Sequence, residues 1–177
     1  RPYVSEHVGL DVADPFNPRA QPDLVGTAYS IPSADESFDS ALSTAALEHL
    51  EEPEIAIREC FRVLRSGGHA VYTVPFIWHT HAEPRDFYRF TSFGLEYLFK
   101  KCGFEVEEVK PLAGFWTTVV TLFNYYIAKF HRGIMRYVPV IPLLGVLLQG
   151  LAYILQSLHA APEWTWMYRI IVRKPVR

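Results

Sequence analysis

The segment from Pro53 to Phe76 constrains the fold of this 177-residue chain more than any other. Proline suits the first turn of a helix, where its missing N–H has no partner to lose, so we expect a helix to begin at Pro53. Gly67–Gly68 would end that helix. The nearly uninterrupted apolar run His69–Phe76 is typical of a strand covered on both faces. The helix has apolar side chains at i, i+3, i+4 and i+7, namely Ile57, Cys60, Phe61 and Leu64.

The rest of the chain continues this alternation of strands and helices. We predict a further helix capped by Thr91 or Ser92. Further strands are predicted at His7–Val12, Asp23–Pro32, Phe38–Ser43, Phe104–Leu112 and Thr165–Lys174. Strands alternating with helices predict an α/β domain whose sheet is mostly parallel, with an antiparallel last strand.

About fifty residues separate the last two strands, so we divide the chain into a core (1–112), a helical insert (113–163) and a returning strand (164–177). In the insert, an apolar stripe from Phe115 to Phe130 indicates one helix, and a second helix with a broad leucine face is expected after Pro142. The uncharged stretch that contains this second helix is shorter than the roughly 20 residues that span a bilayer. We therefore expect peripheral membrane contact through 113–163, with a helical cap or a homo-oligomer interface as the alternative.

Charge is distributed unevenly along the chain, although its net charge is only −2. Residues 1–108 carry 18 acidic and nine basic side chains, whereas residues 109–177 carry one acidic and eight basic ones. Such an asymmetry favours binding of residues 109–177 to an anionic membrane surface. The alternative is that their basic side chains form a face that packs on the acidic residues 1–108. Because residues 1–108 are acidic, the sequence does not favour nucleic-acid binding.

The cellular compartment is indicated by the two cysteines. Cys60 and Cys102 both fall on apolar helix faces, so we expect buried, reduced thiols. No signal peptide is visible. We expect a cytoplasmic protein, peripheral at the inner membrane surface if the insert contacts lipid.

Titratable side chains follow the buried strand directly, in the stretch HTHAEPRDFYRFTS (His79–Ser92). In open α/β sheets, ligands bind beyond the carboxyl ends of the strands. Asp11 and Ser43 end two other predicted strands and should lie at the same edge. The sequence therefore predicts a functional site there.

Three motifs in order resemble the class I S-adenosylmethionine-dependent methyltransferases, and more narrowly their methyltransferase type 11 branch. They are the acidic turn Glu36–Asp39, the Leu-Glu-His turn Leu47–His49, and Arg-Val-Leu-x-x-Gly-Gly at Arg62–Gly68. The resemblance covers roughly residues 4 to 112 and implies a Rossmann-like fold, S-adenosyl-L-methionine as cofactor, and methyl transfer. The stretch after His79 is similar to a subset from bacterial glycan and lipid biosynthesis, which implies a small-molecule, glycan or lipid-linked hydroxyl acceptor.

The resemblance also implies the residues that bind the cofactor. Asp11 stands where the family binds the ribose hydroxyls, and a carboxylate has the two acceptors that suit a diol. Thr27 and Ala28 stand at the adenine position, without the usual acid. Ser43 and Leu47 lie near the methionine part. No G-x-G precedes Asp11, so the family's glycine-rich loop is not in this sequence, and we expect that the chain begins at the family's second strand.

Histidines at this edge are candidates for the base that takes a proton from the acceptor hydroxyl, because histidine titrates near neutral pH. We favour His81, with His49 second. A packing role for each is the alternative. A metal site of His79 and His81 with nearby acids is disfavoured, because no second ligand cluster accompanies them, so no metal is expected.

Arg85 and Arg89 could clamp a phosphate or carboxylate on the acceptor, since guanidinium binds such groups in a bidentate manner. The alternative is an internal pair with Glu83 or Asp86. Tyr88 could line the acceptor pocket. The alternative for the whole chain is a non-catalytic module with a degenerate cofactor site that docks on a partner or membrane.

Overall fold

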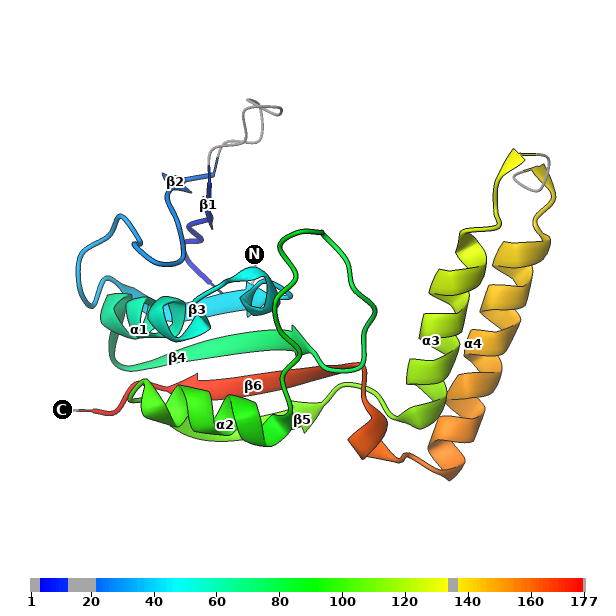
Figure 1. Cartoon of the computed structure of the whole chain (residues 1–177). Coiled ribbons are helices and arrows are strands. Elements are labelled where there is room, and N and C mark those ends of the chain that lie inside the picture. Colours follow the sequence, from blue (N-terminus) through cyan, green and yellow to red (C-terminus); the bar gives the residue numbers. More distant parts are fainter. Residues whose placement is uncertain (1–3, 13–21, 134–136, 177) are drawn as a thin grey trace.

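The computed structural model describes residues 4–12, 22–133 and 137–176. The four longer strands form one sheet in the order β3-β4-β6-β5, and the two shortest form a second sheet (Figure 1). The strands are β1 (Leu10–Asp11), β2 (Leu24–Val25), β3 (Phe38–Thr44), β4 (Leu64–Pro75), β5 (Glu105–Pro111) and β6 (Met167–Arg173). The helices are η1 (Leu47–His49), α1 (Pro53–Val63), α2 (Ser92–Lys101), α3 (Phe115–Ala128), α4 (Val140–Leu158) and η3 (Pro162–Trp164).

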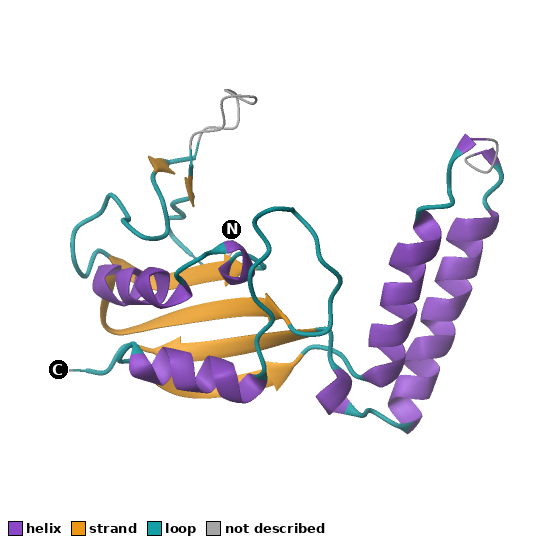
Figure 2. Cartoon of the chain, in the orientation of Figure 1, coloured by secondary structure: helices purple, strands orange, loops and turns teal. Residues whose placement is uncertain are grey.

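The four-stranded sheet confirms the predicted α/β fold class. β3 and β4 run parallel, whereas the last strand, β6, lies antiparallel between β4 and β5. Helices α1 and α2 cover one face of this sheet (Figure 2). The core between these helices and the sheet includes Ile57, Cys60, Leu95, Phe99, Tyr72, Val74, Ile170 and Val172.

The helix starts follow the local sequence signals, but the expected end of the first helix at Gly67–Gly68 is wrong: α1 ends at Val63, and Leu64 already lies in β4. Helix α1 begins at Pro53 as predicted. The Thr91 hydroxyl caps α2 by accepting a hydrogen bond from the Gly94 N–H at 3.0 Å, which satisfies one of the free donors of the first turn. Strand β4 begins at Leu64, several residues earlier than predicted, because Leu64 pairs with Phe38 of β3. The strand contains Gly67 at a φ of 77°, a conformation that glycine adopts without strain.

The first two predicted strands are shorter than expected and stand outside the main sheet. β1 and β2 pair only with each other among the described strands, through two parallel residue pairs. The Gly26 N–H donates to the Asp11 carbonyl and the Leu24 N–H to the Gly9 carbonyl, each at 2.9 Å. The sequence analysis expected a sheet without the family's first strand. Among the described residues no strand lies between β1 and β3 to join the two ladders, so they form two separate sheets.

The predicted helical insert forms a hairpin of α3 and α4 that stands away from the sheet (Figure 1). The Asn124 amide donates to the Gly145 carbonyl across the two helices at 3.3 Å. Helix α4 begins at Val140 and not after Pro142, because proline is tolerated within the first turn. Ala152 is the only fully buried residue of α4.

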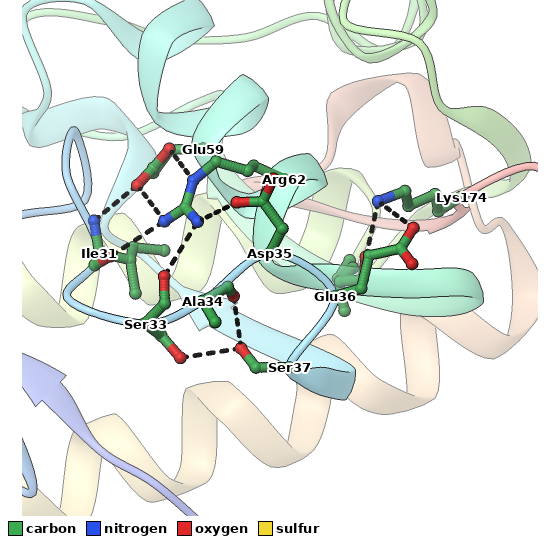
Figure 3. Close-up of polar contacts among 10 residues, drawn as sticks. Ile31, Ser33, Ala34, Asp35, Glu36, Ser37, Glu59, Arg62 and Lys174 are labelled. Carbon is green, nitrogen blue, oxygen red and sulfur yellow. Dashed lines mark hydrogen bonds and ion pairs between the residues drawn. The ribbon is translucent and has the colours of Figure 1, made fainter.

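A polar cluster around Arg62 fastens the segment 31–37 to helix α1 (Figure 3). The Arg62 guanidinium donates to both carboxylate oxygens of Glu59, at 2.8 and 2.9 Å, and to the Ser33 and Ile31 carbonyls at 2.9 and 3.0 Å. Glu59 in turn accepts from the Ile31 N–H at 2.8 Å. This cluster fixes the approach to β3, and β3 leads into the candidate site.

Candidate active site at the carboxyl edge of the sheet

Two segments meet at the carboxyl ends of the parallel strands β3 and β4. They are the turn η1, which follows β3, and the long loop 76–91, which follows β4 (Figure 1). The Glu48 carbonyl accepts hydrogen bonds from the Phe87 and Tyr88 N–H groups at 2.9 and 3.3 Å, and the Tyr88 hydroxyl donates to the Glu51 carbonyl at 2.9 Å. The loop is therefore tied to the turn, as expected where neighbouring parallel strands end together.

This arrangement brings the two predicted histidines together. The rings of His49 and His81 lie 4.8 Å apart, centroid to centroid, at an interplanar angle of 73°. His49 Nδ1 lies 2.5 Å from the Arg85 carbonyl oxygen. A carbonyl only accepts, so Nδ1 carries the proton and His49 Nε2 has the free lone pair.

His81 is oriented in the same way. Its Nδ1 lies 3.4 Å from Asp86 Oδ2 and 3.3 Å from the His79 carbonyl oxygen, both of which are acceptors. The His81 backbone N–H also donates to Asp86 Oδ2, at 2.8 Å. Nδ1 therefore carries the proton in His81 too, which leaves Nε2 free to accept a proton or to bind a ligand.

Glu48 is the member of this site that the sequence analysis did not single out. Its side chain is 0% exposed, and neither carboxylate oxygen has a hydrogen-bond partner among the described residues. Burial raises the pKa of Glu48, against the opposing effects of its own backbone N–H, which lies near the carboxylate without forming a hydrogen bond to it, and of His49, His81 and Arg89. The sequence signal was its place between Leu47 and His49 in the Leu-Glu-His turn.

Asp86 and Arg89 form the internal pair that the sequence left open as an alternative. Arg89 Nη1 and Nη2 donate to the two Asp86 oxygens at 2.7 and 2.8 Å, and the Asp86 side chain is only 3% exposed. The hydrogen bonds from Arg89 are the main cause that lowers the pKa of Asp86, with the His81 backbone N–H adding to it.

The remaining donors of Arg89 also stay within the loop. They reach the carbonyl oxygens of Trp78, Tyr88 and His79 at 3.3, 2.7 and 2.9 Å. This geometry favours a role for Arg89 in holding the loop over a role in binding substrate. Arg85 is exposed in the same loop, and substrate binding by Arg85 and Tyr88 stays a prediction.

The predicted cofactor residues are divided between the two sheets. Asp11 and Thr27 are exposed and lie with Ala28 on or just after β1 and β2, whereas Ser43 is half-buried in β3 and Leu47 is buried in the core. The sequence placed Asp11 at the rim of the same sheet as Ser43. β1 is not part of that sheet, so this placement is wrong for the described residues. The roles of these residues in cofactor binding stay predictions.

Comparison with known proteins gives one matching family model and several partial relatives. Residues 1–72 match the model described as "Methyltransferase domain". Malonyl-[acyl-carrier protein] O-methyltransferase of Methylococcus capsulatus is 44% identical over 50 residues, which cover 28% of this chain and 18% of that protein. The chain spans between 18% and 36% of the length of the curated relatives it matches.

Two solved structures share the fold. The [4+2]-cyclase SpnF superposes with a TM-score of 0.55 at 23% identity, over 86% of this chain and 55% of that chain. Phosphoethanolamine N-methyltransferase 2 of Haemonchus contortus, solved with S-adenosyl-L-methionine, superposes with a TM-score of 0.52 at 17% identity, over 85% of this chain and 36% of that chain. Identities this low establish the fold alone.

Proposed function

We propose that this chain is part of an S-adenosylmethionine-dependent methyltransferase, because residues 1–72 match the family model described as "Methyltransferase domain". The acceptor we propose is a hydroxyl of a small molecule, a glycan or a lipid-linked sugar. The observation that carries the proposal is the pair His49–His81, held at the carboxyl ends of β3 and β4 with both Nδ1 atoms facing acceptors and neither Nε2 atom in a hydrogen bond to any residue that the structure describes.

In the proposed reaction, a histidine takes the proton of the acceptor hydroxyl. His81 Nε2 is the first candidate and His49 Nε2 the second, because a neutral imidazole with a free Nε2 can accept a proton near neutral pH. S-adenosylmethionine supplies an electrophilic methyl group when bound. Holding the hydroxyl in line with that methyl group accounts for much of the rate in such a displacement.

The chemistry of the predicted cofactor residues suits the parts of the cofactor they would hold. The exposed carboxylate of Asp11 can accept from a ribose diol, and the exposed hydroxyl of Thr27 can bond a base edge. Ser43, half-buried next to the η1 turn, would contact the methionine part, and Leu47 would support it from the core.

Cofactor binding is tested by titrating the complete gene product with S-adenosylhomocysteine in a calorimeter. We expect binding, and a loss of at least about tenfold in affinity in Asp11→Asn, the loss expected when one charged hydrogen-bonding group is neutralised. Asp39→Asn is the matched control, because Asp39 is an exposed carboxylate whose partner is Arg65, on β4. Absence of heat from the complete protein would remove the enzyme proposal.

We also propose that the hairpin α3–α4 docks on an anionic lipid bilayer. The sequence analysis expected the uncharged stretch to be too short to span a bilayer, but helix α4 with its 19 residues is long and apolar enough to cross one, by length and composition only. Apolar side chains are exposed around most of its circumference. The exposed ones are Val140, Leu143, Leu144, Val146, Leu147, Leu151, Ile154 and Leu158. A helix that is apolar almost all round but not covered by protein is typical of contact with lipid.

The charges around the hairpin fit the same partner. No acidic residue occurs from Val109 to Pro162, whereas Lys129 and Arg132 follow α3 at the connection between the two helices. Basic residues beside an apolar surface are attracted to anionic headgroups. A membrane location would also bring the site close to lipid-linked acceptors.

Vesicle flotation tests this docking. The protein should float with vesicles of mixed phosphatidylcholine and phosphatidylglycerol, float less with phosphatidylcholine alone, and lose part of its binding in high salt. Leu147→Asp should reduce flotation, whereas Glu163→Gln, outside both helices, should not. Failure to float with either vesicle type would refute lipid docking, and a salt-insensitive dimer in solution would assign the apolar face to a second copy.

The alternative function is a non-catalytic docking module. It is favoured by one observation, the separation of β1 and β2 from the main sheet, which divides the predicted cofactor residues into two groups. Flotation without binding of S-adenosylhomocysteine would support this alternative over the enzyme.

A further inference from the structure

Three side chains with ligand atoms for metal ions converge at the carboxyl edge of the sheet. Glu48, His49 and His81 each offer one such atom, and the three atoms lie within 4.8 Å of one another. We propose that these residues bind a divalent transition-metal ion of the zinc type, with one coordination position open. The sequence analysis expected no metal, because it considered only His79 and His81 with nearby acids and found no second ligand cluster.

The carboxylate of Glu48 is the strongest reason for a ligand. It is fully buried, and both of its oxygens lack a hydrogen-bond partner among the described residues. A buried, unpaired carboxylate is strongly destabilising unless a cation or a proton neutralises it. Among the described residues, the ion-pair contact of Glu48 is with His49 Nε2, at 3.8 Å from Glu48 Oε1, which is too far for a hydrogen bond. A cation between these groups would satisfy the carboxylate.

Both histidines are already oriented as metal ligands. Ligating histidines usually donate their other ring N–H to a carbonyl or a carboxylate, which fixes the ring. His49 Nδ1 faces the Arg85 carbonyl, and His81 Nδ1 faces Asp86, which Arg89 holds in place. The Nε2 lone pairs of both rings are thereby left for the ion.

The donor set indicates the class of ion. Two imidazole nitrogens and one carboxylate oxygen suit zinc or ferrous iron, whereas magnesium and calcium prefer oxygen ligands. Ligand atoms around tetrahedral zinc lie roughly 3.4 Å apart, as bonds of about 2.1 Å require. The present separations are at most 4.8 Å, so the three side chains would move together by about 1 Å on binding.

Such an ion would change the roles of the two histidines, a consequence that rests on the proposed function. Their Nε2 atoms would bind the ion, so neither would act as the base. The open position would bind the acceptor hydroxyl, and the ion would lower its pKa so that the proton leaves to water.

Calorimetric titration tests the site without reference to methyl transfer. The complete protein, stripped with a chelator and dialysed, is titrated with zinc chloride and, separately, with magnesium chloride. We expect one zinc ion per chain, little heat with magnesium, and at least tenfold weaker zinc binding in Glu48→Gln and in His81→Gln. His79→Gln is the matched control, because the His79 ring lies against Tyr125 of α3, with Nδ1 at 2.8 Å from the Thr80 carbonyl oxygen.

Three results would overturn the proposal. The first is zinc binding weaker than about 100 µM, and the second is equal affinity in the wild type and both variants. The third is a loss of zinc affinity in His79→Gln as large as that in His81→Gln, which would move the site to His79 and His81.

Thermal melting without metal adds a folding control. Glu48→Gln should melt at no lower temperature than the wild type, because the substitution removes an unpaired buried carboxylate. A lower melting temperature would mean that Glu48 already has a partner in the protein and would count against the metal site.

Titration of the same samples with S-adenosylhomocysteine separates the two proposals. Zinc binding without cofactor binding would refute the proposed enzyme and leave the metal site in place. Cofactor binding without zinc binding would refute the metal site alone.

Discussion

Replacement of Arg89 by methionine distinguishes the two roles that the sequence allowed for this residue. If Arg89 clamps a substrate, its removal should leave the stability of the free protein almost unchanged. In the structure, however, its guanidinium bonds both oxygens of Asp86 and three loop carbonyls. Arg89→Met should therefore destabilise the folded chain.

The expected loss follows from what the substitution leaves behind. Asp86 is 3% exposed, and removing one partner of a buried ion pair typically costs about 3–5 kcal/mol. Arg89 itself is 24% exposed, so solvent screens part of the interaction. We expect a destabilisation of about 2–4 kcal/mol, which lowers the urea midpoint by roughly 1–2 M for an m-value near 2 kcal/mol/M.

Arg85→Met is the matched control, because Arg85 lies exposed in the same loop. Its effect on the free energy of unfolding should stay within about 0.5 kcal/mol, as for most surface substitutions. Urea unfolding followed by tryptophan fluorescence and by circular dichroism gives both values. Equal midpoints for Arg89→Met and the wild type would refute the structural role and restore the substrate clamp as the better explanation.

Three further predictions concern the scaffold. Phe99→Ala should destabilise by about 3–5 kcal/mol, because Phe99 is fully buried, whereas Phe93→Ala on the same helix, where the side chain is 81% exposed, should change the urea midpoint little. Thr91→Ala should cost about 1 kcal/mol through the lost α2 cap and reduce amide protection in the first helical turn. Hydrogen bonds from Arg62 lower the pKa of Glu59, so their stabilisation is present above the unfolded-state pKa of about 4.3 and is lost as pH falls through the folded-state pKa. The stability of Arg62→Met should therefore fall less between pH 7 and pH 3 than that of the wild type, and parallel urea-midpoint profiles would contradict this coupling.

Much of the fold was predictable because it depends on local periodicity. Residues close to one another in the sequence determine the type of each element. Examples are the apolar stripe of α1, the cap at Thr91 and the apolar run of β4. The same information cannot say which strands pair. β1 and β2 therefore carried correct strand signals but formed a sheet of their own, because pairing depends on which strand edges are available in the folded chain.

The candidate site was predictable in its place but not in its composition. Loop chemistry at the carboxyl end of a buried strand indicated His81, and the resemblance indicated His49. Arg89 could not be assigned, since only distances show that its donors are taken by Asp86 and loop carbonyls.

By itself the sequence determined the α/β alternation, the helical insert with its apolar and basic composition, and the edge of the sheet where polar chemistry gathers. Only the tertiary structure decided that Glu48, adjacent to His49 but over thirty positions before His81, loses all contact with water and faces both rings. The physical reason is that burial and hydrogen-bond partners come from the meeting of η1 with the loop after β4. Residue spacing encodes only local periodicity and cannot specify that long-range contact.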